Sequence, residues 1–175
     1  MVSTSEPQPI ASYDLPRNKA MAVGVVLGIL IGVGNTFLSL AWPSTLEILA
    51  WLLAALIVVL LLHEGLHGLV GKLLGYKPIF GVEPPLVFTT FHERIRRNHL
   101  IAIALAPLIV LDVAAVALYA SGSLRLFADL CFTVNTIGAL GDVWIVSKLV
   151  GHGADTFVQD TKSGVEIWAG AIGSE

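Results

Sequence analysis

The length of 175 residues fits a single domain, but the composition excludes an ordinary soluble one. Hydrophobic residues make up 55% of the chain and charged residues 13%, with a mean hydropathy of +0.82, whereas charged residues are about a quarter of a typical globular protein. The net charge of −3 indicates little, and the single cysteine, Cys131, excludes an intrachain disulfide. We expect an all-α integral membrane protein with four transmembrane helices, surrounded by a lipid bilayer and without a nucleic-acid partner.

Residues 1–18 are rich in serine and proline, and we expect them to form a disordered cytoplasmic N-terminal tail. An apolar stretch at about residues 20–42 follows, long enough to cross the hydrocarbon core of a bilayer. Its glycines at positions 24, 28 and 32 recur every four residues and form a ridge of small residues for close helix packing. This stretch is the first predicted membrane helix.

The second predicted membrane helix begins near Leu46 and carries the sequence His63-Glu64-Gly65-Leu66-His67. Two histidines four residues apart on a helix are about 40° apart around its axis, so both imidazoles leave the same face. His63 and His67 can therefore bind one tetrahedral zinc ion, and Glu64 can act as general base on a zinc-bound water. The alternative is a pair of interior histidines hydrogen-bonded to neighbours, which we disfavour because ionisable groups beside a membrane-spanning run are costly unless they are functional.

Glycines flank the histidine face of this helix, at positions 65, 68, 71 and 75. They either leave a groove for a substrate or let another helix approach closely, and we favour the second.

The connection before the third helix contains two β-prone runs, residues 78–82 and 86–91, separated by Glu83-Pro84-Pro85. A short β-hairpin over about residues 79–91 would offer an edge to an extended peptide, and an amphipathic loop on the membrane surface is the alternative. The alternative metal ligands in this connection are His92, Glu93 and His99. They lie among arginines that suit lipid headgroups, so we expect this segment to be an interfacial anchor instead.

The third predicted helix, at about residues 98–120, contains Pro107 and should kink there. The fourth, at about residues 124–150, carries Asn135, Gly138 and Asp142 on one face. We expect a membrane domain over residues 19–150 and a short cytoplasmic C-terminal tail over residues 151–175. We assign no chemistry to Asp160 in that tail.

The basic residues predict the orientation. Nine of the ten lysines and arginines lie on one side of the predicted helices, and Arg125 is the exception. The positive-inside rule makes that side cytoplasmic. We therefore expect a multi-pass protein of the cell membrane with both termini in the cytoplasm.

Depth along the helices selects a third metal ligand. His63 lies 17 residues from Leu46, and Asp142 lies 18 residues from Leu124, on helices that run in the same direction. At about 1.5 Å per residue the two side chains reach similar depths, roughly 25 and 27 Å. We expect Asp142 to be the third zinc ligand and Asn135 to be a polar neighbour that binds substrate, although an interhelical hydrogen-bond seam is the alternative for this face. Asp112 should lie roughly 15 Å away, too far to be a ligand.

Several short motifs together resemble those of the putative zincin peptidase family of small integral membrane proteins: His63-Glu64-Gly65-Leu66-His67, Ala106-Pro107, Asn135 with Gly141-Asp142, and Asp160 with Gly164. The resemblance covers roughly residues 63–164 and implies a peptidase. More loosely, the pattern is similar to site-2 proteases, where an HExxH helix and an aspartate from a later helix hold zinc. The aspartate of that family lies in an Asn-Pro-Asp-Gly-like motif, whereas Asp142 follows Gly141 and lacks that proline, so substrate handling carries over less closely than ligand chemistry.

The function expected from these observations is that of an intramembrane zinc metallopeptidase, with one catalytic zinc ion, acting on a membrane protein or peptide near the cytoplasmic leaflet. His63, His67 and Asp142 would bind zinc, and Glu64 would be the general base. One alternative is a pseudoprotease that binds membrane segments and uses zinc only for stability. A metal carrier is the other, less favoured because it needs several polar sites along a pathway.

Overall fold

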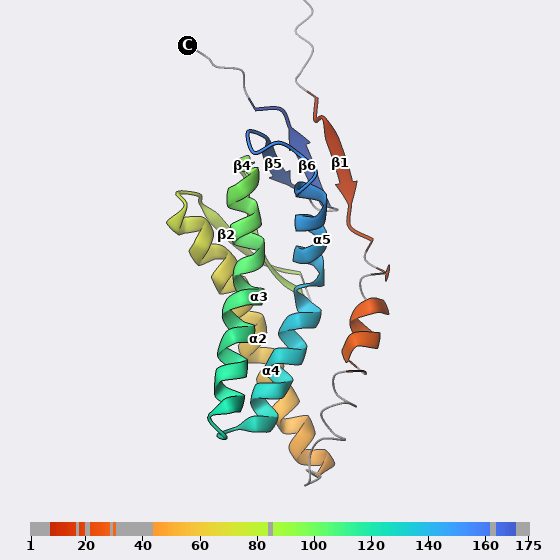
Figure 1. The fold of residues 1–175 in the computed structure, drawn as a ribbon, viewed down its shortest axis with the longest axis vertical. Coiled ribbons are helices and arrows are strands. Elements are labelled where there is room, and N and C mark those ends of the chain that lie inside the picture. Colours follow the sequence, from red (N-terminus) through yellow and green to blue (C-terminus); the bar gives the residue numbers. More distant parts are fainter. Residues whose placement is uncertain are drawn as a thin grey trace, which may run out of the picture.

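The computed structural model describes residues 8–16, 18–19, 22–28, 30, 44–83, 86–161 and 164–170. Three long helical segments lie side by side, and a small sheet lies at one end of them (Figure 1). These segments are α2 (Thr45–Leu73), α3 (Arg97–Ala120) and the consecutive pair α4 (Arg125–Gly138) and α5 (Leu140–Leu149). The first predicted membrane helix, at about residues 20–42, lies partly outside the described residues. Within this range, residues 22–28 are described and are helical.

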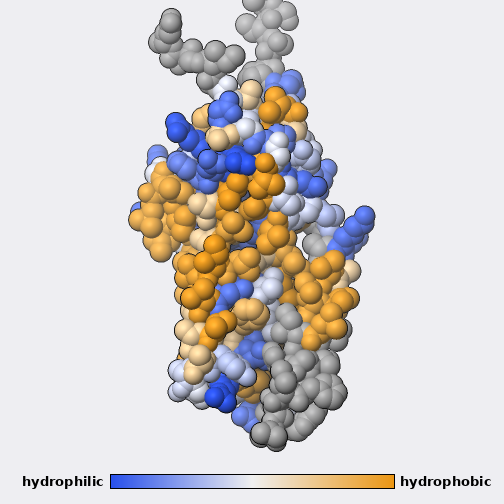
Figure 2. All heavy atoms as spheres, viewed as in Figure 1, coloured by the Kyte–Doolittle hydropathy of each residue, from blue (hydrophilic) through white to orange (hydrophobic). Residues whose placement is uncertain are grey.

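Two helices, α2 and α3, are each long and apolar enough to cross a membrane, and α4 with α5 passes the same test as one bent span. Large apolar side chains on them lie open to the surroundings, among them Leu53 at 61%, Leu61 at 61% and Val113 at 65% exposure. Figure 2 shows hydrophobic residues between a hydrophilic surface at the sheet end and a smaller one at the opposite end. The described part of the chain thus has two or three candidate membrane spans, which indicates membrane association.

The prediction of one continuous helix over residues 124–150 is wrong. The helix is interrupted at Ala139, and α4 and α5 meet there with a bend of 41°. Gly138 and Gly141 flank the break, and glycine disfavours a helix interior by about 1 kcal/mol relative to alanine. Asn135 therefore lies near the end of α4, whereas Asp142 lies in the first turn of α5.

The prediction of an all-α fold is also wrong, because a four-stranded antiparallel sheet forms in the order β1-β6-β5-β4. Its strands are β1 (Ala11–Asp14), β4 (Ile95–Arg96), β5 (Phe157–Asp160) and β6 (Gly164–Trp168). Part of the segment expected to be disordered is thus a strand, paired with β6. The sheet is stable because alternate residues, Val165 and Ile167 on β6, are buried in a core with Leu149.

The connection between α2 and α3 contains two paired antiparallel strands, β2 (Pro78–Glu83) and β3 (Leu86–Phe91). They pack on α2 through aromatic rings. A Cβ atom at Gly68 would collide with the ring of Phe80, and one at Gly71 with the ring of Phe91. Gly68 therefore admits the strand pair rather than another helix, which corrects our expectation for it, whereas Gly71 lies near both Phe91 and, at 3.7 Å, Ile103 of α3.

Candidate metal centre

Three residues that the sequence analysis selects as ligands come together in the structure. The candidate ligand atoms of His63, His67 and Asp142 all lie within 4.8 Å of one another. Asp142 Oδ2 is 3.1 Å from Nε2 of His63 and 3.5 Å from Nε2 of His67. Both histidines are buried, with 7% and 8% exposure. This is a compact donor group contributed by α2 and α5.

Two of the three separations in this group fit a zinc ion. Nitrogen and oxygen ligands bind zinc at about 2.0–2.1 Å, and two such ligands of a tetrahedral ion are then about 3.3 Å apart. The two separations between Asp142 and the histidines, 3.1 and 3.5 Å, lie on either side of that value. Three protein ligands leave one tetrahedral position for water, as catalytic zinc sites require.

Each histidine is fixed through its other ring nitrogen. Nδ1 of His63 lies 2.9 Å from Oδ1 of Asn135, and Nδ1 of His67 lies 2.9 Å from the carbonyl oxygen of Ile103. A carbonyl oxygen only accepts hydrogen bonds, so each Nδ1 carries a proton, and each Nε2 is the ring nitrogen that would bind a metal ion held by this group. Such bonds set the tautomer and the ring orientation that a metal ligand needs.

Pro107 explains why the Ile103 carbonyl is available. In a helix this carbonyl would accept from the N–H of the residue four positions later, which is Pro107, and proline has no N–H. The vacated acceptor binds the imidazole of His67 instead. The sequence signal was a proline inside an apolar helix; we interpreted it only as a kink.

Asn135 is fully buried, and its hydrogen-bonding groups face protein atoms. Its Oδ1 accepts from His63, while its Nδ2 donates to the carbonyl of Pro107 at 3.2 Å and to Oδ1 of Asp112 at 2.8 Å. An amide nitrogen has two hydrogens, and both are used. This environment suits a residue that holds His63 better than one that contacts a substrate.

Asp112 lies closer to the centre than its position along α3 suggested. It is outside the three-residue donor group, but its carboxylate accepts from Asn135 and, at 3.1 Å, from Thr136 Oγ1. Sequence reasoning missed this link because it compared depths along straight helices and not the side chains that bridge them.

Glu64 follows His63 on α2, with a half-buried side chain. Its carboxylate is near enough to His67 for an electrostatic interaction. Its backbone carbonyl accepts a hydrogen bond of 2.9 Å from Thr89 Oγ1, so β3 is attached to α2 at the motif itself.

The alternative ligands have other contacts. His99 Nδ1 lies 2.9 Å from the hydroxyl of Tyr76, and Glu93 accepts from the backbone N–H of Lys77 at 2.6 Å. Among the residues that the structure describes, only His63, His67 and Asp142 form a group of three side chains that could hold a metal ion.

A cavity of about 70 Å³ adjoins the donor group, with His67 and Asp142 in its wall. Asp160, to which the sequence analysis assigned no chemistry, also lines it. Its Oδ2 accepts from Thr90 Oγ1 at 2.8 Å, and burial raises the pKa of this carboxyl, against the opposing effect of that hydrogen bond. The motif that pairs Asp160 with Gly164 was the signal available in the sequence.

Comparisons with known proteins agree with the geometry. A family described as "Putative zincin peptidase" matches residues 56–157. The chain is 31% identical over 155 residues to a Pyrococcus woesei protein described as "Uncharacterized 24.7 kDa protein in gap 5'region", covering 85% of this chain and 69% of the relative. No solved structure matches the chain.

Proposed function

Because the chain belongs to the putative zincin peptidase family, we propose that it is an intramembrane zinc metallopeptidase that hydrolyses peptide bonds of membrane-associated substrates near the cytoplasmic leaflet. The observation that carries this proposal is the convergence of His63, His67 and Asp142 between helices apolar enough to span a membrane. Ionisable groups between membrane-spanning helices are costly unless they serve a function.

The proposed roles follow from the positions of the side chains. His63, His67 and Asp142 hold the zinc ion, which when bound supplies Lewis-acid activation of water and of the scissile carbonyl. Glu64 takes a proton from the attacking water and delivers it to the amine nitrogen of the departing product. Asn135 acts as a positioning residue, because it holds the imidazole of His63.

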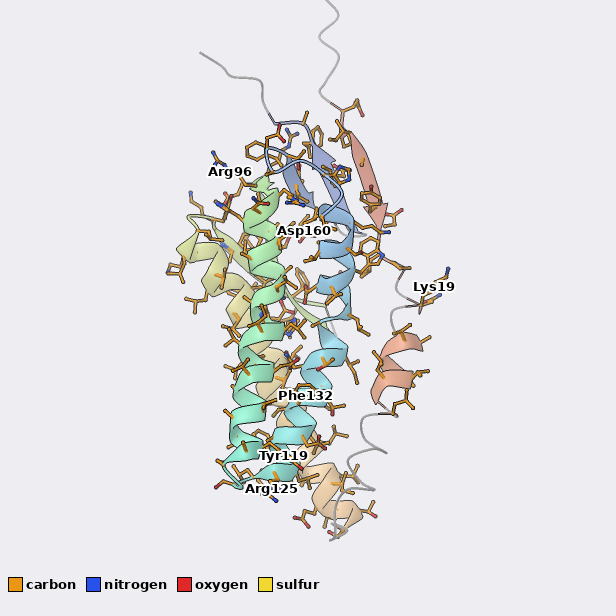
Figure 3. The ribbon with its side chains drawn as sticks, viewed as in Figure 1. Lys19, Arg96, Tyr119, Arg125, Phe132 and Asp160 are labelled. Carbon is orange, nitrogen blue, oxygen red and sulfur yellow. The ribbon has the colours of Figure 1, made fainter. Side chains whose placement is uncertain are left out.

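The distribution of charge supports the cytoplasmic side. Arg96 lies at the sheet end of the helices, and Arg125 lies at the opposite end (Figure 3). The sheet end also carries Arg94, Arg97 and Lys148, and by the positive-inside rule this excess of basic residues favours the cytoplasmic side for that end. We accordingly assign residues 19–150 to a multi-pass domain of the cell membrane, with the sheet and both termini at its cytoplasmic face.

The test uses the full chain, purified in detergent and then reconstituted into liposomes. Zinc content is measured by elemental analysis, and cleavage of a library of synthetic single-span peptides is followed by mass spectrometry. The parent protein should hold one zinc ion and cleave. Glu64→Gln should keep the zinc and lose cleavage, whereas Asp142→Ala should lose both.

Two results would contradict the proposal. Zinc binding by Asp142→Ala as tight as that of the parent would exclude this residue as the third ligand. A zinc-loaded parent that cleaves no peptide, and behaves like Glu64→Gln, would indicate a protein that binds membrane segments without catalysis.

A further inference from the structure

The cavity beside the donor group has a mixed wall. One side carries His67 and Asp142, and most of the remaining wall is apolar. Three apolar members come from α3, where Leu100, Ile103 and Ala104 face it. The cavity therefore offers a largely apolar surface directly beside the site where the peptide bond would be cut.

The size of the cavity limits what it can hold. An apolar cavity of about 150 Å³ takes up benzene, and this one is about half as large at roughly 70 Å³. It has room for a small aliphatic group but not for an aromatic ring. A peptide bound across the donor group could place one such side chain there.

Asp160 gives this cavity a fixed polar group. It comes from β5, whereas the donor group comes from α2 and α5, so the sheet contributes to the wall of the cavity. Thr90 on β3 donates to one carboxylate oxygen, which fixes the side chain. The carboxylate also interacts with the backbone N–H of Thr161, and because a carboxylate offers about four lone-pair sites, it can still accept a hydrogen bond from a ligand.

We propose that this cavity binds a small aliphatic side chain of the substrate beside the scissile bond, and that Asp160 accepts a hydrogen bond from a backbone N–H of the same substrate. The inference rests on the proposed peptidase function and adds to it a substrate class and a positioning contact.

The experiment uses a matched set of probes: hydroxamates of N-acetylglycine, N-acetylvaline and N-acetylphenylalanine. Each carries a zinc-binding group and one backbone N–H, and they differ only in the side chain. Their dissociation constants are measured by isothermal titration calorimetry on the zinc-loaded full chain in detergent. The valine probe should bind at least about tenfold more tightly than the glycine probe, and the phenylalanine probe should lose that advantage.

Two variants separate the contacts. Ala104→Leu fills the cavity and should lower the affinity for the valine probe to about that for the glycine probe. Asp160→Asn should weaken all three probes by a similar factor, about tenfold, and leave the preference in place. The control is Ala115→Leu, which enlarges another buried alanine of α3 outside the cavity wall and should change neither property.

Zinc content and thermal unfolding are recorded for every variant, and Ala104→Val replaces Ala104→Leu if the larger side chain prevents folding. Equal binding of the valine and glycine probes by a zinc-loaded, cleaving parent overturns this inference and leaves the proposed function intact. A parent that neither binds zinc nor cleaves peptides refutes the proposed function, and the inference with it.

Discussion

Nδ1 of His67 on α2 donates a hydrogen bond of 2.9 Å to the carbonyl oxygen of Ile103 on α3. This acceptor is free because the residue one turn later, Pro107, lacks the N–H that would occupy it in a regular helix. A local defect in one helix thus orients a side chain of another, and it does so at the candidate metal centre.

Pro107→Ala should restore the N–H that competes with His67 for the Ile103 carbonyl. We expect α3 to become more regular, while zinc affinity falls by about 10- to 100-fold, the usual cost of losing an outer contact to a metal-bound histidine. Competition with a chromophoric chelator measures the affinity. An unchanged affinity would show that the Ile103 contact does not orient the imidazole.

Asn135→Leu should remove the acceptor for His63 and the donor to Asp112 at once. Zinc affinity should fall by about 10- to 100-fold, and the free energy of unfolding by roughly 1–3 kcal/mol because Asp112 loses a partner. Thr136→Val is the control: it removes the other donor to Asp112 and leaves His63 untouched. It should lower stability alone, and a matching loss of zinc affinity would argue against a specific role for Asn135.

Gly68→Ala should displace the β2–β3 strand pair, because a methyl group there meets the ring of Phe80. We expect a destabilisation of about 1–3 kcal/mol, measured by thermal unfolding in detergent. Gly65→Ala tests the same substitution one turn earlier on α2, where a Cβ atom would meet nothing within 4 Å. It should be neutral or stabilising by up to about 1 kcal/mol, since alanine favours the helix. Equal effects at both sites would contradict the packing described.

Asp160→Asn should change how stability depends on pH. Burial raises the pKa of Asp160 in the folded protein, so folding favours the protonated carboxyl. Its favourable contribution is complete below the unfolded-state pKa, about 3.9, and is lost as pH rises through the higher folded-state pKa. The variant should therefore be more stable than the parent near pH 7, and this advantage should shrink in acid.

Thermal unfolding of both proteins, from acid pH to pH 7, measures the effect as the difference between their stabilities at each pH. A difference that does not vary with pH would contradict the raised pKa.

The sequence by itself determined the membrane character and the ligand chemistry. The apolar runs predicted α2 and α3, whose starts lie within one residue of the expected positions. The spacing of His63 and His67 placed both imidazoles on one face, and counting residues brought Asp142 to their depth. These properties depend on helix geometry within single segments, and that geometry is regular enough to read from residue numbers.

Only the tertiary structure decided which side chains surround that group. The four-stranded sheet joins β1 and β4 to the consecutive strands β5 and β6 from distant parts of the sequence, and strands of only two to five residues leave little local pattern. The break at Ala139, the contacts of Asn135 and the position of Asp160 beside the donor group likewise depend on how elements pack. A buried polar group takes its partners from whatever neighbours packing brings near, because it must be satisfied in the absence of water.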